Sequence, residues 1–166
     1  IVVAKLNGIK NKDINNALTN YVGVKRRFSF LGKKNMAYVF DDYAHHPTEI
    51  AATLSAAKSL KNKVIVVFQP HRYTRTKILI REFIKVLSKV DYLFLLETYS
   101  AGEKIIKGAT SKDIYSKILK INKNTTYLKN IGDLNKLMKP YTLHQNTIVF
   151  MGAGSISSIA KKYLNN

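Results

Sequence analysis

Two short polar clusters hold most of the side chains in this sequence that could take part in chemistry. Residues 41–49 read Asp-Asp-Tyr-Ala-His-His-Pro-Thr-Glu, and residues 69–77 read Gln-Pro-His-Arg-Tyr-Thr-Arg-Thr-Lys. The clusters contain three of the four histidines and two of the five arginines. Carboxylates and imidazoles can move protons, and paired guanidinium groups bind carboxylates or phosphates. The clusters are therefore candidates for a catalytic or binding site.

Each cluster follows an apolar run and precedes a helical pattern. The runs are residues 36–40 and 64–68, and the second is rich in β-branched residues, which is typical of a buried parallel strand. In an open α/β sheet, ligands bind at the carboxyl ends of the strands. We therefore expect both clusters to lie at one ligand-binding edge.

The first cluster leaves several interpretations open. Asp41 and Asp42 could hold a metal or a pair of ribose hydroxyls, but side chains alternate along a strand, so one carboxylate is expected to be structural. His45 and His46 also point apart in an extended backbone. Zinc needs three or four converging ligands, and the sequence offers no matching third ligand. The alternative to a functional role is that the histidines cap the following helix.

The second cluster favours an anion receptor. Arg72 and Arg75 are three residues apart and share one face if the helix has begun. Two guanidinium forks beside the free N–H groups of a helix start would bind a carboxylate or a phosphate. The alternative is a solvated helix start, which does not account for so dense a His-Arg-Tyr-Thr-Arg string.

Three other stretches give weaker signals. Gly152–Ser155 could be a phosphate loop, but it lacks the third glycine of the dinucleotide fingerprint, so a tight turn is favoured. Thr98–Glu103 could line the same edge at a third strand end, and His144 is expected to be a surface residue. The sequence contains no Gly-x-x-x-x-Gly-Lys-[Ser/Thr] loop, so a chain that used ATP would hold only part of the site.

Composition narrows the function classes. The 166 residues carry a net charge of +18, from 23 lysines and 5 arginines against 10 acidic residues. A basic nucleic-acid-binding α/β module is therefore an alternative, although the lysines are spread along the chain rather than gathered in a block. The chain has no cysteine, which excludes disulfides, thiolate zinc sites and a cysteine nucleophile. Its apolar runs are too short to span a bilayer.

Alternating patterns predict an α/β fold with a mostly parallel sheet covered by helices on both faces. We expect a domain boundary near Gly23, after two short helices. In the first part, residues 1–6 form a helical tail and Asp13 caps a helix over 14–21. In the second, Gly32–Asn35 form a turn and Ser111 caps a helix. The expected strands are 28–31, 36–42, 64–68, 92–96, 125–128 and 147–151, and the expected helices are 47–60, 74–90, 111–119, 131–138 and 155–163.

In order and spacing, several motifs resemble the Mur ligase family. They are Gly-Val-Lys-Arg-Arg-Phe at 23–28, the stretch 41–58, Val-Phe-Gln-Pro-His-Arg-Tyr-Thr-Arg-Thr at 67–76, Glu-Thr-Tyr-Ser-Ala-Gly-Glu at 97–103, and Gly108-Ala109. The resemblance implies that 23–166 is the Rossmann-like C-terminal domain of such a ligase. It also implies that 1–22 is the C-terminal tail of the central ATPase domain. The UDP-binding domain and most of the ATPase domain, with its phosphate loop and Mg²⁺ ligands, would then lie outside this chain.

The resemblance also implies an activity and a set of roles. The activity is the ATP- and Mg²⁺-dependent addition of L-alanine to UDP-N-acetylmuramate in the cytoplasm, through an acyl phosphate, for peptidoglycan synthesis. The isolated fragment would be inactive, with no role for nucleic acid or membrane insertion. The implied ATP-binding residues are Arg27, Asp42 and Tyr43. The implied amino-acid-binding residues are His45, which would also be catalytic, His71, Arg72 and Arg75. A stand-alone phosphate-dependent enzyme on the same fold is a further alternative, weakened by the missing phosphate loop.

Overall fold

A six-stranded sheet forms the centre of the structure, a computed structural model that describes residues 1–21 and 23–165. Val22, at the expected domain boundary, and Asn166 lie outside the described residues. The strand order is β1-β2-β6-β3-β4-β5, and β1 is antiparallel to β2 while the other neighbours are parallel. The strands are β1 (Ser29–Lys34), β2 (Ala37–Asp42), β3 (Val64–Phe68), β4 (Tyr92–Leu96), β5 (Thr125–Leu128) and β6 (Thr147–Met151). The predicted α/β class is confirmed.

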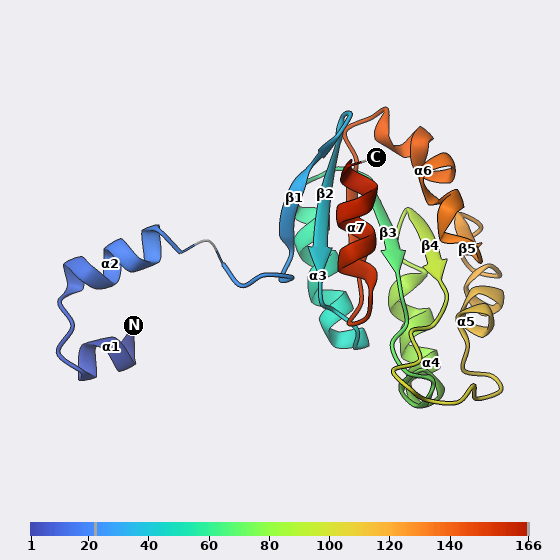
Figure 1. Cartoon of the computed structure of the whole chain (residues 1–166), viewed down its shortest axis with the longest axis horizontal. Coiled ribbons are helices and arrows are strands. Elements are labelled where there is room, and N and C mark those ends of the chain that lie inside the picture. The colour runs from blue at the N-terminus through green and yellow to red at the C-terminus, as the bar shows by residue number, and fades with distance from the viewer. Residues whose placement is uncertain (22, 166) are drawn as a thin grey trace.

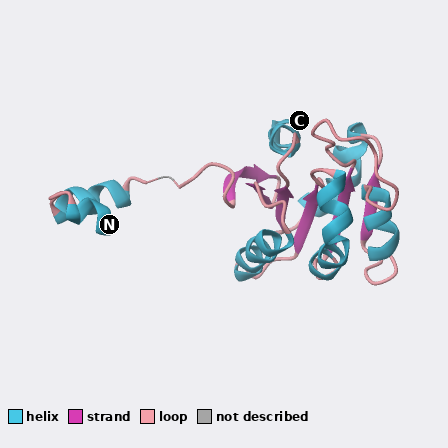
Figure 2. Ribbon diagram, turned by 90° about the horizontal axis from the view of Figure 1, so that it is seen from below, coloured by secondary structure: helices cyan, strands magenta, loops and turns pink. Residues whose placement is uncertain are grey.

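Helices cover both faces of this sheet, as Figure 2 shows. One layer contains α3 (Pro47–Ser59), α4 (Tyr73–Leu87) and α5 (Ser111–Ile118). The other contains α6 (Leu134–Thr142), preceded by a 3₁₀ turn at Ile131–Asp133, and α7 (Ile156–Asn165). From β2 to β5 the chain moves across the sheet in one direction, and its connecting helices lie on one face. It then returns to β6 through α6 on the opposite face. This change of face is expected, because crossovers between parallel strands share one hand.

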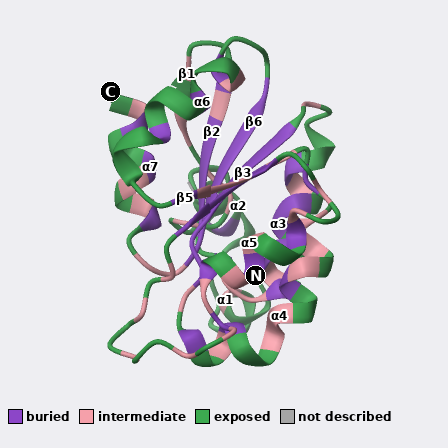
Figure 3. Cartoon of the chain, turned by 90° about the vertical axis from the view of Figure 1, so that its right-hand side faces the viewer, coloured by how far each residue is buried: buried purple, intermediate pink, exposed green. Residues whose placement is uncertain are grey.

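The apolar pattern of the central strands explains this double covering. All five residues of β3 and of β6 are buried, and their side chains alternate between two apolar cores. Val64, Val66 and Phe68 face α3, α4 and α5, whereas Ile65 and Val67 face α6 and α7. Figure 3 shows the buried strands between helices whose outer sides are exposed. A strand that is apolar on both sides is stable only when both sides are covered.

The two N-terminal helices lie apart from the sheet. In Figure 1, α1 (Val2–Leu6) and α2 (Asn11–Thr19) lie away from β1 and the rest of the sheet. Several of their apolar side chains are well exposed, including those of Val3 and Leu6. No helix in the described part of the chain is long and apolar enough to span a membrane.

Four local predictions are wrong in detail. The expected turn at Gly32–Asn35 is mostly strand, because a bulge between Phe30 and Gly32 lets Lys33 and Lys34 pair with β2. Lys10, rather than Asp13, is the N-cap of α2, and Asp13 lies in the first helical turn. Thr110, rather than Ser111, caps α5, with a reciprocal contact from Asp113. The helix expected at 131–138 begins at Leu134 after the 3₁₀ turn and continues to Thr142.

Gly152, directly after β6, offers a test of how tightly the strand ends pack. Its φ is +149°, and an added Cβ would lie 2.7 Å from the carbonyl oxygen of Gln69. We expect Gly152→Ala to lower the free energy of unfolding by about 2 kcal/mol or more, through strain and overpacking together. Gly102→Ala is the control, because Gly102 has a φ of +86° but an added Cβ there would meet nothing within 4 Å. Gly102→Ala should lower the free energy of unfolding by about 1 kcal/mol, through backbone strain alone. Equal losses in urea titrations of the two variants would contradict the overpacking argument.

Candidate active site

The parallel register brings four loops to one edge of the sheet. Met151, the last residue of β6, is paired with Asp42 of β2 on one side and with Phe68 of β3 on the other. Phe68 is in turn paired with Leu95 of β4. The chain therefore leaves these strands at nearly the same level, and both polar clusters lie at this edge as predicted.

Asp41 and Asp42 face opposite sides of the sheet, as strand alternation predicts. Asp41 accepts a hydrogen bond from the Ser157 hydroxyl of α7 at 2.6 Å and lies 3.7 Å from Arg26 Nε. Asp42 accepts from the backbone N–H groups of Phe28 at 2.6 Å and Ala44 at 2.7 Å. Both carboxylates are buried. Asp41 thus links the sheet to α7, and Asp42 links the backbone of the first cluster at Ala44 to the segment before β1 at Phe28.

His46 and Glu49 begin α3 with a reciprocal cap. The His46 side chain accepts from the Thr48 N–H at 3.3 Å, and Glu49 Oε2 accepts from the N–H groups of His45 at 3.0 Å and His46 at 3.2 Å. Partial burial alone would raise the pKa of Glu49, but these two N–H groups and the charges of His45 and Arg27 lower it overall. The alternative that a histidine caps the following helix is thus confirmed for His46.

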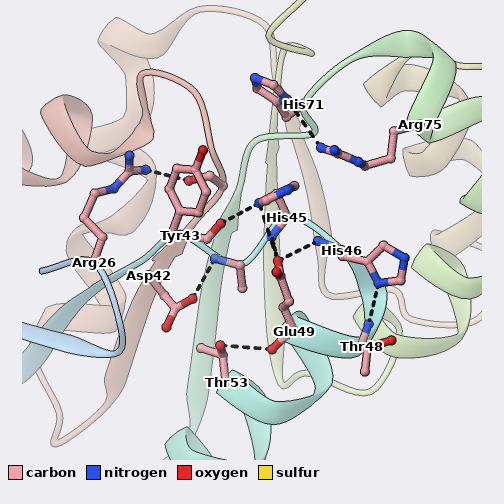
Figure 4. Close-up of polar contacts among 12 residues, drawn as sticks. Arg26, Asp42, Tyr43, His45, His46, Thr48, Glu49, Thr53, His71 and Arg75 are labelled. Atoms are coloured by element: carbon pink, nitrogen blue, oxygen red, sulfur yellow. Dashed lines mark hydrogen bonds and ion pairs between the residues drawn. The ribbon is translucent and has the colours of Figure 1, made fainter. Parts of the chain in front are cut away.

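The His45 imidazole lies between Glu49 of this cap and His71 of the second cluster (Figure 4). Its Nδ1 lies 2.9 Å from the carbonyl oxygen of Tyr43 and 3.4 Å from Glu49 Oε2. The Tyr43 ring packs edge-on against the imidazole at 5.1 Å between centroids, and the His71 ring lies 6.1 Å away. The structure therefore brings His45 and His71 together from two different strand ends.

His71 is held between an arginine and a tyrosine. A guanidinium nitrogen of Arg75 lies 3.4 Å from its Nδ1, and the Tyr99 ring stacks on the imidazole at 5.5 Å with an interplanar angle of 10°. The backbones of His71 and Tyr99 also form an isolated parallel bridge. Partial burial, followed by the positive charges of Arg75, His45 and Arg72, lowers the pKa of His71 from its ordinary value of 6.5. The neutral imidazole is thus favoured in the folded chain.

Arg72 begins α4 in an unusual conformation. It is the N-cap residue, has a φ of +70°, and donates its backbone N–H to the Tyr99 carbonyl at 2.9 Å. The first turn of α4 is capped by Glu103, which accepts from the Thr74 N–H at 3.0 Å and the Thr74 hydroxyl at 2.6 Å. These two hydrogen bonds lower the pKa of Glu103. The loop after β4 thus fixes the turn that carries both arginines.

Arg26 belongs to an arginine pair that stands out in this lysine-rich sequence, but only its neighbour Arg27 was expected at the site. The Arg26 guanidinium lies over the Tyr43 ring at 4.6 Å and donates to the carbonyl oxygen of Gly152 at 2.6 Å (Figure 4). Arg27, the neighbour expected to bind ATP, is exposed, and its charge reaches Glu49. Arg26 is the arginine of the pair that turns inward, and the sequence contains no signal that identifies it.

Glycines let the fourth loop lie close to the others. An added Cβ on Gly154 would lie 2.6 Å from Cγ of Tyr99 and 2.8 Å from Oε1 of Gln69. Gly152–Ser155 is thus a close-packed turn against the β3 and β4 loops, in agreement with the favoured interpretation. Tyr99 and Glu103, from the stretch 98–103 that could line this edge, do contact residues of the second cluster. His144 is exposed, as predicted.

The site therefore combines an imidazole pair, an arginine-rich helix start and buried carboxylates at one edge. One contact group is formed by the side chains of Tyr43, His45, His71 and Arg75. Arg72 lies exposed beside this group, and Asp42 is buried at the end of β2. Within residues 1–21 and 23–165, no group of three or more His, Cys, Asp or Glu side chains is placed to hold a metal ion. These features define an α/β domain that carries arginine and histidine side chains at the carboxyl ends of its strands, the edge at which open α/β sheets bind ligands.

Comparison with known proteins identifies the family. Residues 26–154 match the family described as "Mur ligase, glutamate ligase domain". The chain therefore belongs to the Mur ligase family.

Similar sequences agree with this assignment. The UDP-N-acetylmuramate–L-alanine ligase of Carboxydothermus hydrogenoformans is 42% identical over 95% of this chain. The enzyme of the same name from Rickettsia typhi is 40% identical over 91%. The chain spans 34% and 32% of these two relatives, about a third of their length.

A solved structure extends the likeness to the fold. UDP-N-acetylmuramate-alanine ligase from Thermotoga maritima matches 99% of this chain with a TM-score of 0.77 and 28% identity, and the chain covers 35% of it. None of these findings supports the alternative of a nucleic-acid-binding module.

The lowered pKa of His71 predicts a pH-dependent stability. The unfolded chain, in which the histidine pKa is near 6.5, binds a proton at His71 more readily than the folded chain does. The contribution of neutral His71 to the free energy of unfolding is therefore complete above pH 6.5. It is lost as the pH falls from 6.5 through the lower folded value. Urea unfolding at about pH 7.5 and about pH 5.5 should therefore show lower stability at the acidic pH. His71→Gln should reduce that difference, while His144→Gln, at an exposed position, should leave it unchanged. An undiminished difference in His71→Gln would contradict the prediction.

Proposed function

We propose that this chain is the C-terminal part of an ATP-dependent ligase that adds L-alanine to UDP-N-acetylmuramate in the synthesis of peptidoglycan precursors. The observation that carries the proposal is the identity of about 40%, along at least nine-tenths of the chain, to ligases named for this reaction. The convergence of His45, His71 and Arg75 at the ligand-binding edge supports it. Because its nucleotide substrates are cytoplasmic, the reaction belongs to the cytoplasm.

The proposed reaction has three steps. ATP transfers its γ-phosphoryl group to the carboxylate of UDP-N-acetylmuramate, which gives ADP and an acyl phosphate. The amine of L-alanine attacks the acyl carbon, and the tetrahedral intermediate expels phosphate to leave an amide. Mg²⁺ would neutralise the phosphate charges and would be held by residues outside this chain. An acyl phosphate hydrolyses readily, so a domain that closes over it and excludes water would protect it.

The second cluster would hold the amino acid. Arg72 and Arg75, fixed by the capped start of α4, would bind the alanine carboxylate through charge-assisted hydrogen bonds, with His71 supporting them. His45, 6.1 Å from His71 between ring centroids, would lie beside the amine and the acyl phosphate as the catalytic residue. The bound amine would thereby be presented in one orientation.

The first cluster and Arg27 would face the nucleotide. Arg27 is exposed and free to reach phosphates of ATP, and the Tyr43 side chain, also exposed, would lie beside the nucleotide. Asp42 would bind the ribose hydroxyls. Its two oxygens already accept backbone N–H groups, but each carboxylate oxygen has a second lone pair that can accept a hydroxyl.

Residues 1–22 would be the tail of the central domain, and 23–166 the C-terminal domain. The exposed apolar side chains of α1 and α2 support this division, because two short helices cannot bury their apolar faces by themselves. In the longer protein they would pack on the domain that precedes them.

The whole proposal is tested with the longer protein of which this chain is a part. Purified protein should form ADP only when UDP-N-acetylmuramate, L-alanine and ATP are all present, and mass spectrometry should detect the amide. Absence of product with all three substrates, from a folded protein that contains this segment, would sink the proposal.

Arg72→Ala in the longer protein should raise the apparent KM for L-alanine by roughly 10- to 100-fold, since a charge-assisted hydrogen bond contributes about 1.5–3 kcal/mol. The KM for ATP should change little. Arg81→Ala removes an exposed arginine further along α4 and serves as the control. An unchanged KM for alanine in Arg72→Ala would exclude the carboxylate role.

The 166-residue chain by itself should not catalyse the reaction, because the groups that bind the UDP substrate and the ATP phosphates would lie on other domains. With all three substrates, the purified chain should release no ADP above a protein-free blank. Turnover by this chain would show that the division of the site between domains is wrong.

A further inference from the structure

One hydrogen bond and one ion-pair contact of His45 fix which of its ring nitrogens carries a proton. Nδ1 lies 2.9 Å from the Tyr43 carbonyl oxygen and 3.4 Å from Glu49 Oε2. A carbonyl oxygen and an ionised carboxylate can only accept hydrogen bonds, so Nδ1 must be the donor. In the neutral ring, Nε2 then keeps its lone pair and is a proton acceptor.

His71 has the opposite arrangement. Its Nδ1 lies 3.4 Å from a guanidinium nitrogen of Arg75, and a guanidinium can only donate. Nδ1 of His71 is therefore an acceptor, and its proton is on Nε2. The stacked Tyr99 ring restricts the orientation of this imidazole. Two neighbouring histidines thus offer the site one acceptor and one donor.

Glu49 is fixed firmly enough to set the state of His45. Its Oε2 accepts from the backbone N–H groups of His45 and His46 at 3.0 and 3.2 Å, so the carboxylate is anchored beside the ring that it contacts. Its pKa is lowered, which keeps the group ionised and unable to donate at neutral pH. Figure 4 shows the Glu49 carboxylate in contact both with the backbone at the start of α3 and with the imidazole of His45.

We propose that Glu49 is a positioning residue that holds His45 in the Nδ1–H tautomer, so that Nε2 accepts the proton which the alanine nitrogen must lose before it attacks. This rests on the proposed function. The Nε2 lone pair takes one proton from the ammonium group, the nitrogen keeps the bonding pair as its nucleophilic lone pair, and the positive charge passes to His45. The Glu49 carboxylate, 3.4 Å from Nδ1, stabilises that imidazolium. His71, as a donor, contributes a hydrogen bond to an oxygen of the bound alanine.

A role in helix capping alone would also explain the backbone contacts of Glu49, so the variants must separate the two roles. Glu49→Ala removes both the cap and the carboxylate beside Nδ1, and leaves the Tyr43 carbonyl as the acceptor for the Nδ1 proton. Glu49→Gln keeps a carbonyl oxygen that can cap the helix and lie beside Nδ1. Glu82→Ala removes an exposed carboxylate on α4 and controls for the change in charge.

The experiment uses the ¹⁵N-labelled 166-residue chain and two-bond ¹H–¹⁵N correlation spectra of the imidazoles at about pH 8, where histidine is neutral. His45→Gln and His71→Gln assign the two rings. The Nδ1–H form should dominate at His45 and the Nε2–H form at His71. Glu49→Ala should shift the His45 tautomer ratio by about tenfold towards Nε2–H, which corresponds to about 1.4 kcal/mol. Glu49→Gln and Glu82→Ala should retain the wild-type ratio, and His71 should be unchanged in all three variants.

Two results would overturn the proposal: a dominant Nε2–H form at His45 in the unmodified chain, or a His45 ratio that Glu49→Ala leaves unchanged. The first requires no variant, so it remains decisive even if Glu49→Ala unfolds. None of these spectra depends on ligase activity. A longer protein that failed to make the amide would refute the proposed function without altering the tautomers, and wrong tautomers would not affect the ligase assay.

Discussion

Parallel pairing of β6 with both β2 and β3 is the constraint on which the site depends. The last residue of β6 is level with the last residues of its two neighbours, so three loops leave the sheet within one short edge. β6 comes last in the sequence but lies between the second and third strands. The site is therefore incomplete until the C-terminal strand has been inserted, and its residues are brought together by topology rather than by nearness in the chain.

Contacts between loops from different strands then hold the functional side chains. Arg26, before β1, bonds to the loop after β6; His71, after β3, stacks on Tyr99, after β4; and Thr74 is capped by Glu103 from the same β4 loop. The chain has a net charge of +18, yet the few carboxylates at this edge lie beside its arginines and histidines. They set the orientation of the cationic groups, and the exposed arginines remain available for an anionic ligand.

The sequence predicts most of the fold because its apolar runs are unambiguous. Val64–Phe68 and Thr147–Met151 are almost wholly apolar on both faces, as is typical of a covered parallel strand, and both have the predicted bounds. Each polar cluster directly follows one of the apolar runs, so the sequence also indicates that the clusters lie at the carboxyl edge of the sheet. The extent of β1 could not be predicted, because a strand that continues past a bulge through Gly32 resembles a turn in the sequence.

The fine structure of the site depends on contacts that have no local signature. Nothing near Arg26 indicates that it packs on Tyr43 and bonds to Gly152, more than a hundred residues away. The cap of α4 is similarly hidden, since Glu103 belongs to a loop 29 residues later. By contrast, Glu49 lies at the position where a capping box expects an acidic residue, so its capping role is readable from sequence. Its contact with the His45 ring is not.

The cap that Glu103 provides has a consequence for protein design. A helix start is usually capped by its own N-cap side chain, so a strand–loop–helix unit can be moved between scaffolds with its terminus intact. Here Arg72 occupies the N-cap position with a φ of +70°, and the hydrogen bonds that complete the first turn come from a different crossover of the sheet. The segment 64–87 would lose the geometry of its arginines if it were grafted elsewhere alone. The smallest portable unit extends through the loop that ends at α5.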